Sequence, residues 1–291
     1  MTTRRRVLVT GATGNVGGAV LRNLASDPTL ELVAATRNPD KAGDLGVATA
    51  LFDFDKPETF VPALKGTDSV FLMTGYTVDM LNQSKMIVDA AIEAGVRYIL
   101  HLGSPGNDDT RVAHYGWQQL VERYIEWSGI PYTHLRPQIF MQNLLGYGNT
   151  GIVKDGVLRQ YVGDAKLSWV DCEDVGLVAA ACLRDVEAHQ GQTYRLGYDL
   201  KGYAEIASIL TEFVGQPFRY EPLPAQQFYE KALAAGAEPV YMSSVYENYL
   251  DLEAGRGPGV RELFDNFEQL TGNKPRLLRD FIRANAARFA Y

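Results

Sequence analysis

The sequence predicts a doubly wound α/β fold, in which a parallel sheet is followed by a smaller, mostly helical C-terminal annex. From the first residue to about 150, apolar segments of strand length alternate with segments of helical periodicity. Such alternation is typical of parallel strands joined by crossover helices. Several of the strand segments are nearly continuous apolar runs, as expected for strands covered on both faces. A glycine-rich turn between the first strand and the first helix favours the same class of fold.

The first 150 residues contain the predicted sheet. Its strands are expected at 6–10, 31–36, 48–51, 69–73, 98–102 and 133–135. Helices are expected at 80–94 and 113–128, and Gly129-Ile130-Pro131 ends the second of them. The buried face of that helix is expected to follow the i, i+3, i+4, i+7, i+8 spacing, with Trp117, Leu120, Val121, Tyr124 and Ile125.

After residue 150 the pattern is less regular. Turns are expected at 149–151 and 154–156, an apolar helix up to Leu183, helices at 203–214 and 225–235, and amphipathic stretches at 261–270 and 276–289. Asp171 and Asp174 are expected to cap the helix that they precede, rather than to act in catalysis. We therefore treat 1–150 as a first domain and 151–291 as a region that returns partly to the sheet and otherwise forms the annex, with a cleft between the two.

Composition limits the classes of function. The 291 residues are 46% hydrophobic, yet no apolar run reaches the roughly 18 to 20 residues that span a bilayer. The basic start, Met1 to Arg6, precedes a strand too short for a signal peptide, so we expect a cytoplasmic protein without a membrane partner. A net charge of −7 disfavours nucleic acid, and a homodimer is compatible with the sequence. Cys172 and Cys182 form neither a disulfide framework nor a zinc site, and we expect small buried side chains.

The glycine-rich turn predicts a nucleotide-binding site. It lies between the apolar run Val7-Leu8-Val9 and a helix, and it consists of Thr10, Gly11, Ala12, Thr13, Gly14, Asn15, Val16 and Gly17. Glycine is needed where the chain turns sharply, where backbone amides approach a pyrophosphate, and where the helix packs tightly on the strand. The amides and dipole of the helix N-terminus then bind the phosphates. The context of strand, turn and helix therefore predicts a Rossmann domain.

The end of the second strand favours NADP(H) over NAD(H). An NAD-binding domain places an acidic residue there, against the ribose 2′-hydroxyl. This chain instead has Arg37, whose guanidinium matches a 2′-phosphate in two hydrogen bonds. Asp40 lies further on, where the next helix is expected to begin. Lys41 either adds charge to the same phosphate or is an ordinary surface lysine.

The motifs together resemble the NmrA-like group of atypical short-chain dehydrogenases/reductases. The resemblance rests on the glycine turn, on 36–42, on 129–137 and on 169–175, and it extends over essentially the whole chain. It implies that Asp53 and Phe54 flank the adenine, that Thr74-Gly75 pass near the ribose and pyrophosphate, and that Gly103-Ser104 approach the nicotinamide. The group includes triphenylmethane, quinone and isoflavone-type reductases as well as redox-sensing regulators.

The catalytic lysine of these relatives is missing. Short-chain dehydrogenases use a Tyr with a Lys four residues later, but Tyr115 is followed at that spacing by Gln119. The isoflavone-type reductases place a lysine at the position of Gln118. Without an ammonium beside it, Tyr115 is expected to keep a pKa near about 10 and to be a poor base. His114, with a pKa expected near about 6.5, suits proton delivery better, unless it only caps the helix. Candidate catalytic residues are therefore His114, Tyr115 and Gln118.

These residues favour an NADPH-dependent oxidoreductase that transfers a hydride directly to a small conjugated or aromatic substrate of the quinone, azo, dye or enone type. Such acceptors need no strong acid from the protein. A flat substrate would suit the aromatic side chains near the expected cleft, unless these form core: Tyr76, Trp117, Phe140, Tyr147 and Trp169. Two alternatives remain open, an NADP(H)-binding redox sensor and a non-redox isomerase or lyase. His101, His134 and His189 have no partner at ligand spacing, so the sequence predicts no metal site.

Overall fold

A seven-stranded sheet in the order β11-β6-β5-β4-β1-β2-β3 organises the structure, a computed structural model that describes residues 4–41, 45–146 and 153–291. Every neighbouring pair from β6 to β3 is parallel. The strands are β1 (Arg5–Val9), β2 (Leu30–Thr36), β3 (Ala48–Leu51), β4 (Ser69–Met73), β5 (Tyr98–Leu102), β6 (Tyr132–Pro137) and β11 (Gln192–Leu196). The chain runs outward from β1 in both directions, so the strand order reverses between β1 and β4. In open parallel sheets, this switch point is where ligands bind.

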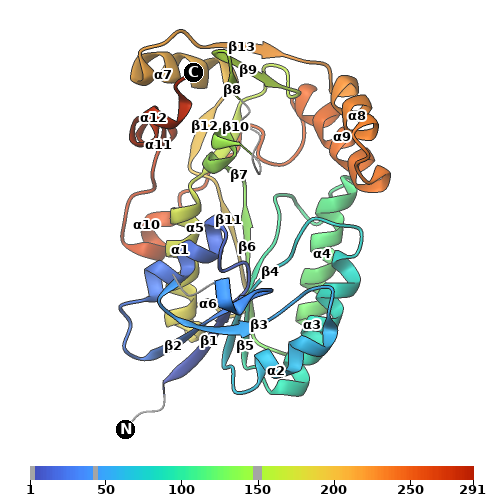
Figure 1. Ribbon diagram of the computed structural model, residues 1–291, viewed down its shortest axis with the longest axis vertical. Coiled ribbons are helices and arrows are strands. Elements are labelled where there is room, and N and C mark those ends of the chain that lie inside the picture. The colour runs from blue at the N-terminus through green and yellow to red at the C-terminus, as the bar shows by residue number, and fades with distance from the viewer. Residues whose placement is uncertain (1–3, 42–44, 147–152) are drawn as a thin grey trace. The chain divides into compact units, whose positions relative to one another are not determined.

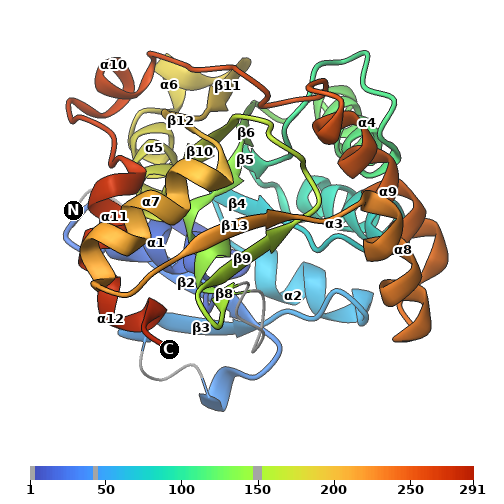
Figure 2. The same ribbon diagram turned by 90° about the horizontal axis from the view of Figure 1, so that it is seen from above.

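Helices cover both faces of this sheet (Figures 1 and 2). On one face lie α1 (Asn15–Leu24) and α5 (Cys172–Arg184), and on the other lie α2 (Phe60–Leu64), α3 (Met80–Ala94) and α4 (Ala113–Trp127). All five residues of β5 are buried, as the continuous apolar runs predict. The two helices on the first face approach closely because α5 has Gly176 at the crossing. A Cβ atom there would lie 2.6 Å from the Cβ of Ala19 on α1.

The chain forms two compact units, and it passes between them more than once. The first unit comprises Met1–Ser104, Trp117–Arg136 and Cys172–Tyr194, within the described residues. The second comprises Pro105–Gly116, Pro137–Asp171 and Arg195–Tyr291. The first unit therefore obtains α5 and the short α6 (Val186–His189) from a part of the chain that follows residue 150. No single boundary separates the two units.

The second unit contains two small sheets and most of the C-terminal helices. Its sheets have the orders β12-β10-β7 and β13-β9-β8. The strands are β7 (Ile139–Phe140), β8 (Val153–Lys154), β9 (Val157–Gln160), β10 (Leu167–Val170), β12 (Asp199–Lys201) and β13 (Arg219–Pro222). The helices are α7 (Tyr203–Val214), α8 (Ala225–Ala234), α9 (Pro239–Glu253), α10 (Phe267–Thr271), α11 (Leu278–Ala284) and α12 (Ala286–Phe289). Trp169 lies fully buried in this core, where its ring contacts Tyr203 edge to face at 5.6 Å.

The amphipathic stretch expected at 261–270 is helical only in its second half, and residues 261–266 form no helix. Helix α10 begins only at Phe267. Before it, the backbone N–H of Arg261 donates to the carbonyl of Lys166, and that of Phe264 donates to the carbonyl of Gly197. Tertiary hydrogen bonds thus replace helical ones. Leu120 was also wrongly placed on the buried face of α4, since it is 56% exposed, whereas Val121 and Ile125 are buried as expected.

Helix α9 was not predicted at all, because its buried face is partly polar. Its buried residues are Ser244, Asn248 and Leu252, which follow an i, i+4, i+8 spacing. Val240 and Leu250 are exposed instead. The helix begins with Pro239 after Glu238, whose carboxylate accepts hydrogen bonds from the N–H groups of Val240 and Tyr241. The turn expected at 149–151 lies outside the described residues.

The close crossing of α1 and α5 predicts the effect of one added methyl group. Gly176→Ala is expected to destabilise the protein by about 1–3 kcal/mol, because the new Cβ must displace backbone of α1. Gly116→Ala is the matched control, since a Cβ in that helical position meets nothing within 4 Å among the described residues. It should stabilise by about 0.5–1 kcal/mol. Urea unfolding of both variants checks this, and equal effects would contradict the close crossing.

Candidate functional site

A cavity of about 480 Å³ opens at the carboxyl ends of β1, β2 and β4 in the first unit. Its wall includes the glycine turn, the end of β2 and the residues after β4. Six of the residues predicted to bind a cofactor line it, namely Gly11, Thr13, Arg37, Phe54, Thr74 and Gly75. The cavity lies at the switch point of the sheet, which is where a dinucleotide is expected.

The glycine turn has the geometry of a phosphate-binding loop. Gly11 has φ of +61°, a conformation that favours glycine. A Cβ at Gly17 would lie 2.3 Å from the carbonyl oxygen of Gly11, so only glycine allows the first turn of α1 to approach this backbone. Gly14 precedes α1 and offers no capping side chain. The first N–H groups of the helix, from Asn15 to Gly17, therefore lack acceptors within it and can bind an anion.

Two threonines lie where the glycine turn meets the end of β4. The hydroxyl of Thr10 donates to the carbonyl of Phe71 and accepts from the N–H of Met73, which holds the ends of β1 and β4 together. Thr74 is the next residue of the same strand end. Among the described residues its Oγ1 is buried without a hydrogen-bond partner, and Thr74 lines the cavity. A buried hydroxyl without a partner beside a cavity indicates a place where a polar group of a ligand can bind.

Arg37 lies at the far end of the cavity, directly after β2. Its side chain is exposed, and among the described residues it makes no hydrogen bond or ion pair. The guanidinium is thus available to an anionic ligand. Asp40 was expected where the next helix begins, and it lies in a short 3-10 helix, Pro39–Lys41. The side chain of Lys41 lies outside the described part of the structure.

The residues after β3 divide between the cavity and the surrounding structure. Phe52 and Phe54 line the cavity, and their rings contact each other edge to face at 5.5 Å. Phe52 was not predicted as a site residue, although its alternation with Phe54 could have indicated a shared aromatic wall. Asp53 does not line the cavity. Its carboxylate pairs with Lys56 at 3.5 Å and accepts from the N–H of Asp55.

The residues predicted to approach the nicotinamide follow β5. The N–H of Gly103 donates to the carbonyl of Leu135 on β6, which fixes this segment to the sheet. Ser104 is buried. A Cβ at Gly103 would lie 3.0 Å from a carboxylate oxygen of Glu122, and 3.4 Å from the ring of His101. The chain after β5 therefore passes directly over a buried polar group of residues.

That buried group contains one candidate catalytic residue. Gln118 is 2% exposed, and its side chain lies near enough to His101 to influence the pKa of the imidazole. Burial lowers the pKa of His101 to about 3 and that of His134 to about 2. Both rings are therefore neutral at physiological pH. Glu122 forms a two-point ion pair with Arg136, through Nε at 3.0 Å and through Nη2.

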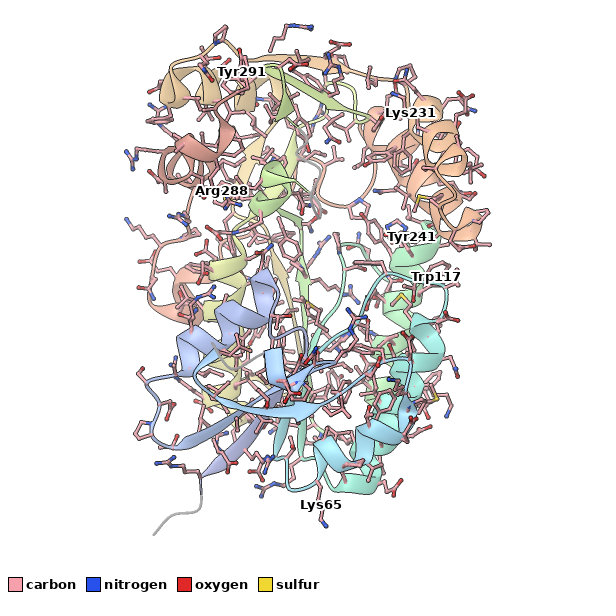
Figure 3. All side chains as sticks on the ribbon, in the orientation of Figure 1. Lys65, Trp117, Lys231, Tyr241, Arg288 and Tyr291 are labelled. Atoms are coloured by element: carbon pink, nitrogen blue, oxygen red, sulfur yellow. The ribbon has the colours of Figure 1, made fainter. Side chains whose placement is uncertain are left out.

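His114 and Tyr115 lie in the second unit, at the start of α4, with residues of α9 around them. The backbone N–H of His114 donates to Oγ of Ser244, and its Nδ1 lies 2.8 Å from the same oxygen. The rings of Tyr115 and Tyr241 lie 4.3 and 5.7 Å from that of His114. Figure 3 marks Tyr241 on α9. The sequence could not have indicated these partners, because α9 was not predicted.

The structure corrects both pKa expectations for this pair. Burial lowers the pKa of His114 to about 4, so the imidazole is neutral at pH 7 and does not deliver a proton as an imidazolium. Burial also raises the pKa of Tyr115 well above 10, while a hydrogen bond with Asn248 acts in the opposite direction. The phenol keeps its proton, so Tyr115 is an even poorer base than its ordinary pKa implies.

The aromatic residues expected near a cleft have different environments. Trp169 belongs to the core of the second unit. Trp117, marked on α4 in Figure 3, and Tyr76 pack against the core of the first unit. Phe140 is half-buried on β7, and Tyr147 lies outside the described residues. A different aromatic group occurs in the second unit, where the rings of Tyr161, Phe228 and Tyr249 lie 4.8 to 5.4 Å apart.

Asp171 occupies the position before α5, as a capping residue would. Its carboxylate is fully buried and accepts hydrogen bonds from Gln142 at 2.6 Å and from Arg276 at 3.0 Å. Asp174 lies within the first turn of the helix and is also buried. The contacts of Asp171 with Gln142 and Arg276 join distant parts of the second unit. They give this carboxylate a structural role that the sequence did not reveal.

Comparison with known proteins finds relatives along the whole chain. The model of the NmrA-like family matches residues 3–272. The NAD(P)H azoreductase of Xenophilus azovorans is 31% identical over 288 residues, which cover 97% of this chain and 99% of that protein. The (4-alkanoyl-5-oxo-2,5-dihydrofuran-3-yl)methyl phosphate reductase of Streptomyces griseus subsp. griseus is 30% identical, over 98% of this chain and 99% of that protein.

Solved structures show the same fold. The crystal structure of the Citrobacter sp. triphenylmethane reductase complexed with NADP(H) covers 96% of this chain and 99% of its own, with a TM-score of 0.82 and 24% identity. No helix among the described residues is long and apolar enough to cross a membrane.

The environment of His114 predicts a pH dependence of stability. The folded-state pKa of about 4 lies below the ordinary 6.5, so the unfolded chain takes up this proton first as the pH falls. The stabilisation present above pH 6.5 is therefore lost between pH 6.5 and pH 4, by about 2 kcal/mol at pH 5. Urea unfolding at pH 7.5 and pH 5 measures it. His114→Gln should reduce the pH dependence by this amount, and His189→Gln, at a partly exposed histidine, should reduce it less. An unchanged pH dependence in His114→Gln would refute the assignment.

Proposed function

The chain belongs to the NmrA-like family, and from this premise we propose that it is an NADPH-dependent reductase of small conjugated or aromatic acceptors. The observation that carries the proposal is the cavity at the switch point, in which residues of the glycine turn, Thr74 and Arg37 line one space. The relatives support the class of substrate. The azoreductase is named for azo compounds, and the Streptomyces reductase for a 5-oxo-2,5-dihydrofuran that has an alkanoyl group.

The residues present fit an NADP(H) molecule in this cavity. The N-terminal amides of α1, from Asn15 to Gly17, would bind the pyrophosphate, because no capping side chain competes for them. Arg37 would bind the 2′-phosphate in the two-point geometry that guanidinium offers. Phe52 and Phe54 would form the wall beside the adenine. Thr74 and Gly75 would lie along the ribose and pyrophosphate, with Gly103 and Ser104 toward the nicotinamide.

When bound, NADPH supplies a hydride, and the protein supplies binding, orientation and exclusion of water. The chain has no lysine at either catalytic position of the related enzymes, where it has Gln118 and Gln119. His114 and Tyr115 are both neutral and not basic at pH 7. We therefore assign His114 and Tyr115 the role of hydrogen-bonding a substrate and not of taking its proton. Acceptors whose reduced form is neutral, or is protonated by water, suit such a site.

A position for Gln118 among the catalytic groups has less support. Its side chain is buried with His101 in the first unit and is almost inaccessible. We propose that it stabilises the segment beneath Gly103 and does not contact the substrate. A cytoplasmic location and a homodimer remain predictions from the sequence.

The role of Arg37 predicts a change in cofactor preference. Arg37→Ala should weaken NADPH binding by about 10- to 100-fold, because a charge-assisted pair is worth about 1.5–3 kcal/mol. Binding of NADH, which lacks the phosphate, should change little. Arg97→Ala is the matched control. Arg97 directly precedes β5, at the amino ends of the strands and away from the cavity at their carboxyl ends, and it pairs with Asp68. Fluorescence titration of both cofactors measures the ratio. An equal loss for NADPH and NADH would place the 2′-phosphate elsewhere.

The proposed chemistry predicts which acceptors are reduced and how variants behave. The purified protein should oxidise NADPH steadily with a triarylmethane cation, an azo dye or a quinone. Hydride addition to the cationic carbon requires no proton. Removal of a general acid is expected to lower a rate by about 100-fold or more. Tyr115→Phe should therefore lower the rate of reduction of the cation by less than this. Absorbance of NADPH follows the reaction.

Two outcomes would contradict a reductase. Tight NADPH binding without reduction of any acceptor would favour the sensor. Conversion of a substrate without net change in the cofactor would favour an isomerase or lyase.

A further inference from the structure

The buried polar group beneath Gly103 has an unusual set of donor atoms. His101 on β5 and His134 on β6 are partners in the parallel register of the two strands, so their side chains leave the sheet side by side. Gln118 and Glu122 are four residues apart on α4 and lie on the same face of that helix. One ring nitrogen of each histidine and one carboxylate oxygen of Glu122 lie within 4.8 Å of one another. All of these residues belong to the first unit.

The donor atoms of this group are unpaired to an extent that folding does not normally allow. His101 and His134 are both 0% exposed, and Gln118 is 2% exposed. In the part of the chain that the structure describes, no hydrogen bond of normal geometry reaches a ring nitrogen of either histidine or Oε1 of Gln118. The nearest groups are each other, since Gln118 lies beside His101, and the carboxylate of Glu126, 3.4 Å from Nε2 of His134. A buried polar atom left unpaired costs about 1–3 kcal/mol. Two buried imidazoles and a buried amide that together lack most of their hydrogen-bond partners indicate that something else pairs with them.

We propose that this group is a divalent-metal site of the zinc class, with His101, His134 and Glu122 as ligands and the amide oxygen of Gln118 as a fourth. Two imidazoles and one carboxylate form a frequent ligand set for zinc in proteins, and a further oxygen completes four-coordination. A bound cation would pair one nitrogen of each histidine and the oxygen of Gln118. It would also join β5, β6 and α4, so its role would be structural. The proposal is independent of the proposed reductase activity.

The surroundings of Glu122 leave room for a metal bond. Arg136 donates to both carboxylate oxygens of Glu122, and Arg123 lies 3.7 Å from one of them. Each carboxylate oxygen has two lone pairs, so the pair with Arg136 does not use all of them. These two cations oppose a further positive charge. Glu126 offsets this in part, because its carboxylate lies 3.4 Å from Nε2 of His134.

The position of Glu126 is also typical of a metal-bound histidine. Such a histidine commonly donates its second ring N–H to a carboxylate, which orients the ring. Zinc bonds of about 2.0–2.1 Å bring tetrahedral ligand atoms to about 3.4 Å from one another. The present spread of up to 4.8 Å would therefore close by up to about 1.4 Å on binding. Rotation of the side chains supplies such a movement without a change in the sheet.

The sequence predicted no metal site, because no pair of these residues has the local spacing of a ligand motif. Neighbouring parallel strands bring together residues that are 33 positions apart, His101 and His134. Glu122 then reaches them from the helix between these strands. Only the strand register reveals the group, and the registers of β5 and β6 are not readable from the sequence.

Metal binding is tested on the untagged, full-length protein. The protein is stripped with EDTA, incubated with Zn²⁺ or Co²⁺, and desalted, and the metal per chain is measured by mass spectrometry. We expect one equivalent retained, a rise in the thermal unfolding midpoint that EDTA reverses, and a visible Co²⁺ spectrum of low-coordinate nitrogen and oxygen ligands. Failure of the wild-type protein to retain either metal would overturn the proposal.

Variants identify the ligands. His101→Gln and His134→Gln should retain less than one-tenth of the metal held by the wild-type protein. His189→Gln is the matched control, because His189 is a partly exposed histidine that contacts Tyr194 instead, and it should retain the full equivalent. Loss of metal in His189→Gln alone would show adventitious surface binding and refute the site. If the two cluster variants do not fold, side-chain NMR of the wild-type protein decides, since added Zn²⁺ must shift the His101 and His134 resonances and leave His189 unchanged.

Discussion

The close approach of Gly17 to the backbone of Gly11 is the constraint on which the first unit depends. It places the start of α1 against the end of β1, directly after Thr10, Gly11 and Thr13, which line the cavity. A side chain at Gly17 would push the helix away from this backbone, and one at Gly11 would meet the side chain of Met73. The hydroxyl of Thr10 adds to this arrangement by holding β4 beside β1. The wall of the cavity formed by the glycine turn and by Thr74 depends on these two contacts, one between backbones and one through the hydroxyl of Thr10.

The sheet and the cofactor site could be predicted from the sequence because both depend on local signals. The apolar runs located β1 to β6 to within about two positions, although the short β7 was missed, and the glycine turn proved to line the cavity through Gly11 and Thr13. Arg37 was identified by its distance from a strand end, and it lines the cavity. Phe52 was missed because a buried aromatic residue beside a strand is typical of any core. Asp53, also expected beside the adenine, does not line this cavity, and its carboxylate pairs with Lys56.

The second unit was harder to predict because tertiary contacts replace local patterns there. The buried face of α9 consists partly of Ser244 and Asn248, so hydrophobic periodicity does not reveal the helix. The N–H of Arg261 bonds to the carbonyl of Lys166, which holds an apparently amphipathic segment outside a helix. The environments of His114 and Tyr115 depend on α9, and their pKa values could not be inferred without it. The His101 and His134 pair was missed for a related reason, because strand register and not spacing brings it together.

The division of the first unit along the chain has a consequence for folding during synthesis. One face of α1 packs on α5, at Ala19 and Gly176, so these partners are made far apart in time. Until residue 184 has left the ribosome, that face of the sheet is covered by α1 without α5. The apolar surface that α5 later covers therefore stays exposed while two segments of the second unit, Pro105–Gly116 and Pro137–Asp171, are synthesised. Contacts of such long sequence separation slow folding. A chaperone that binds nascent apolar surface would therefore find its target on the α1 face of this sheet.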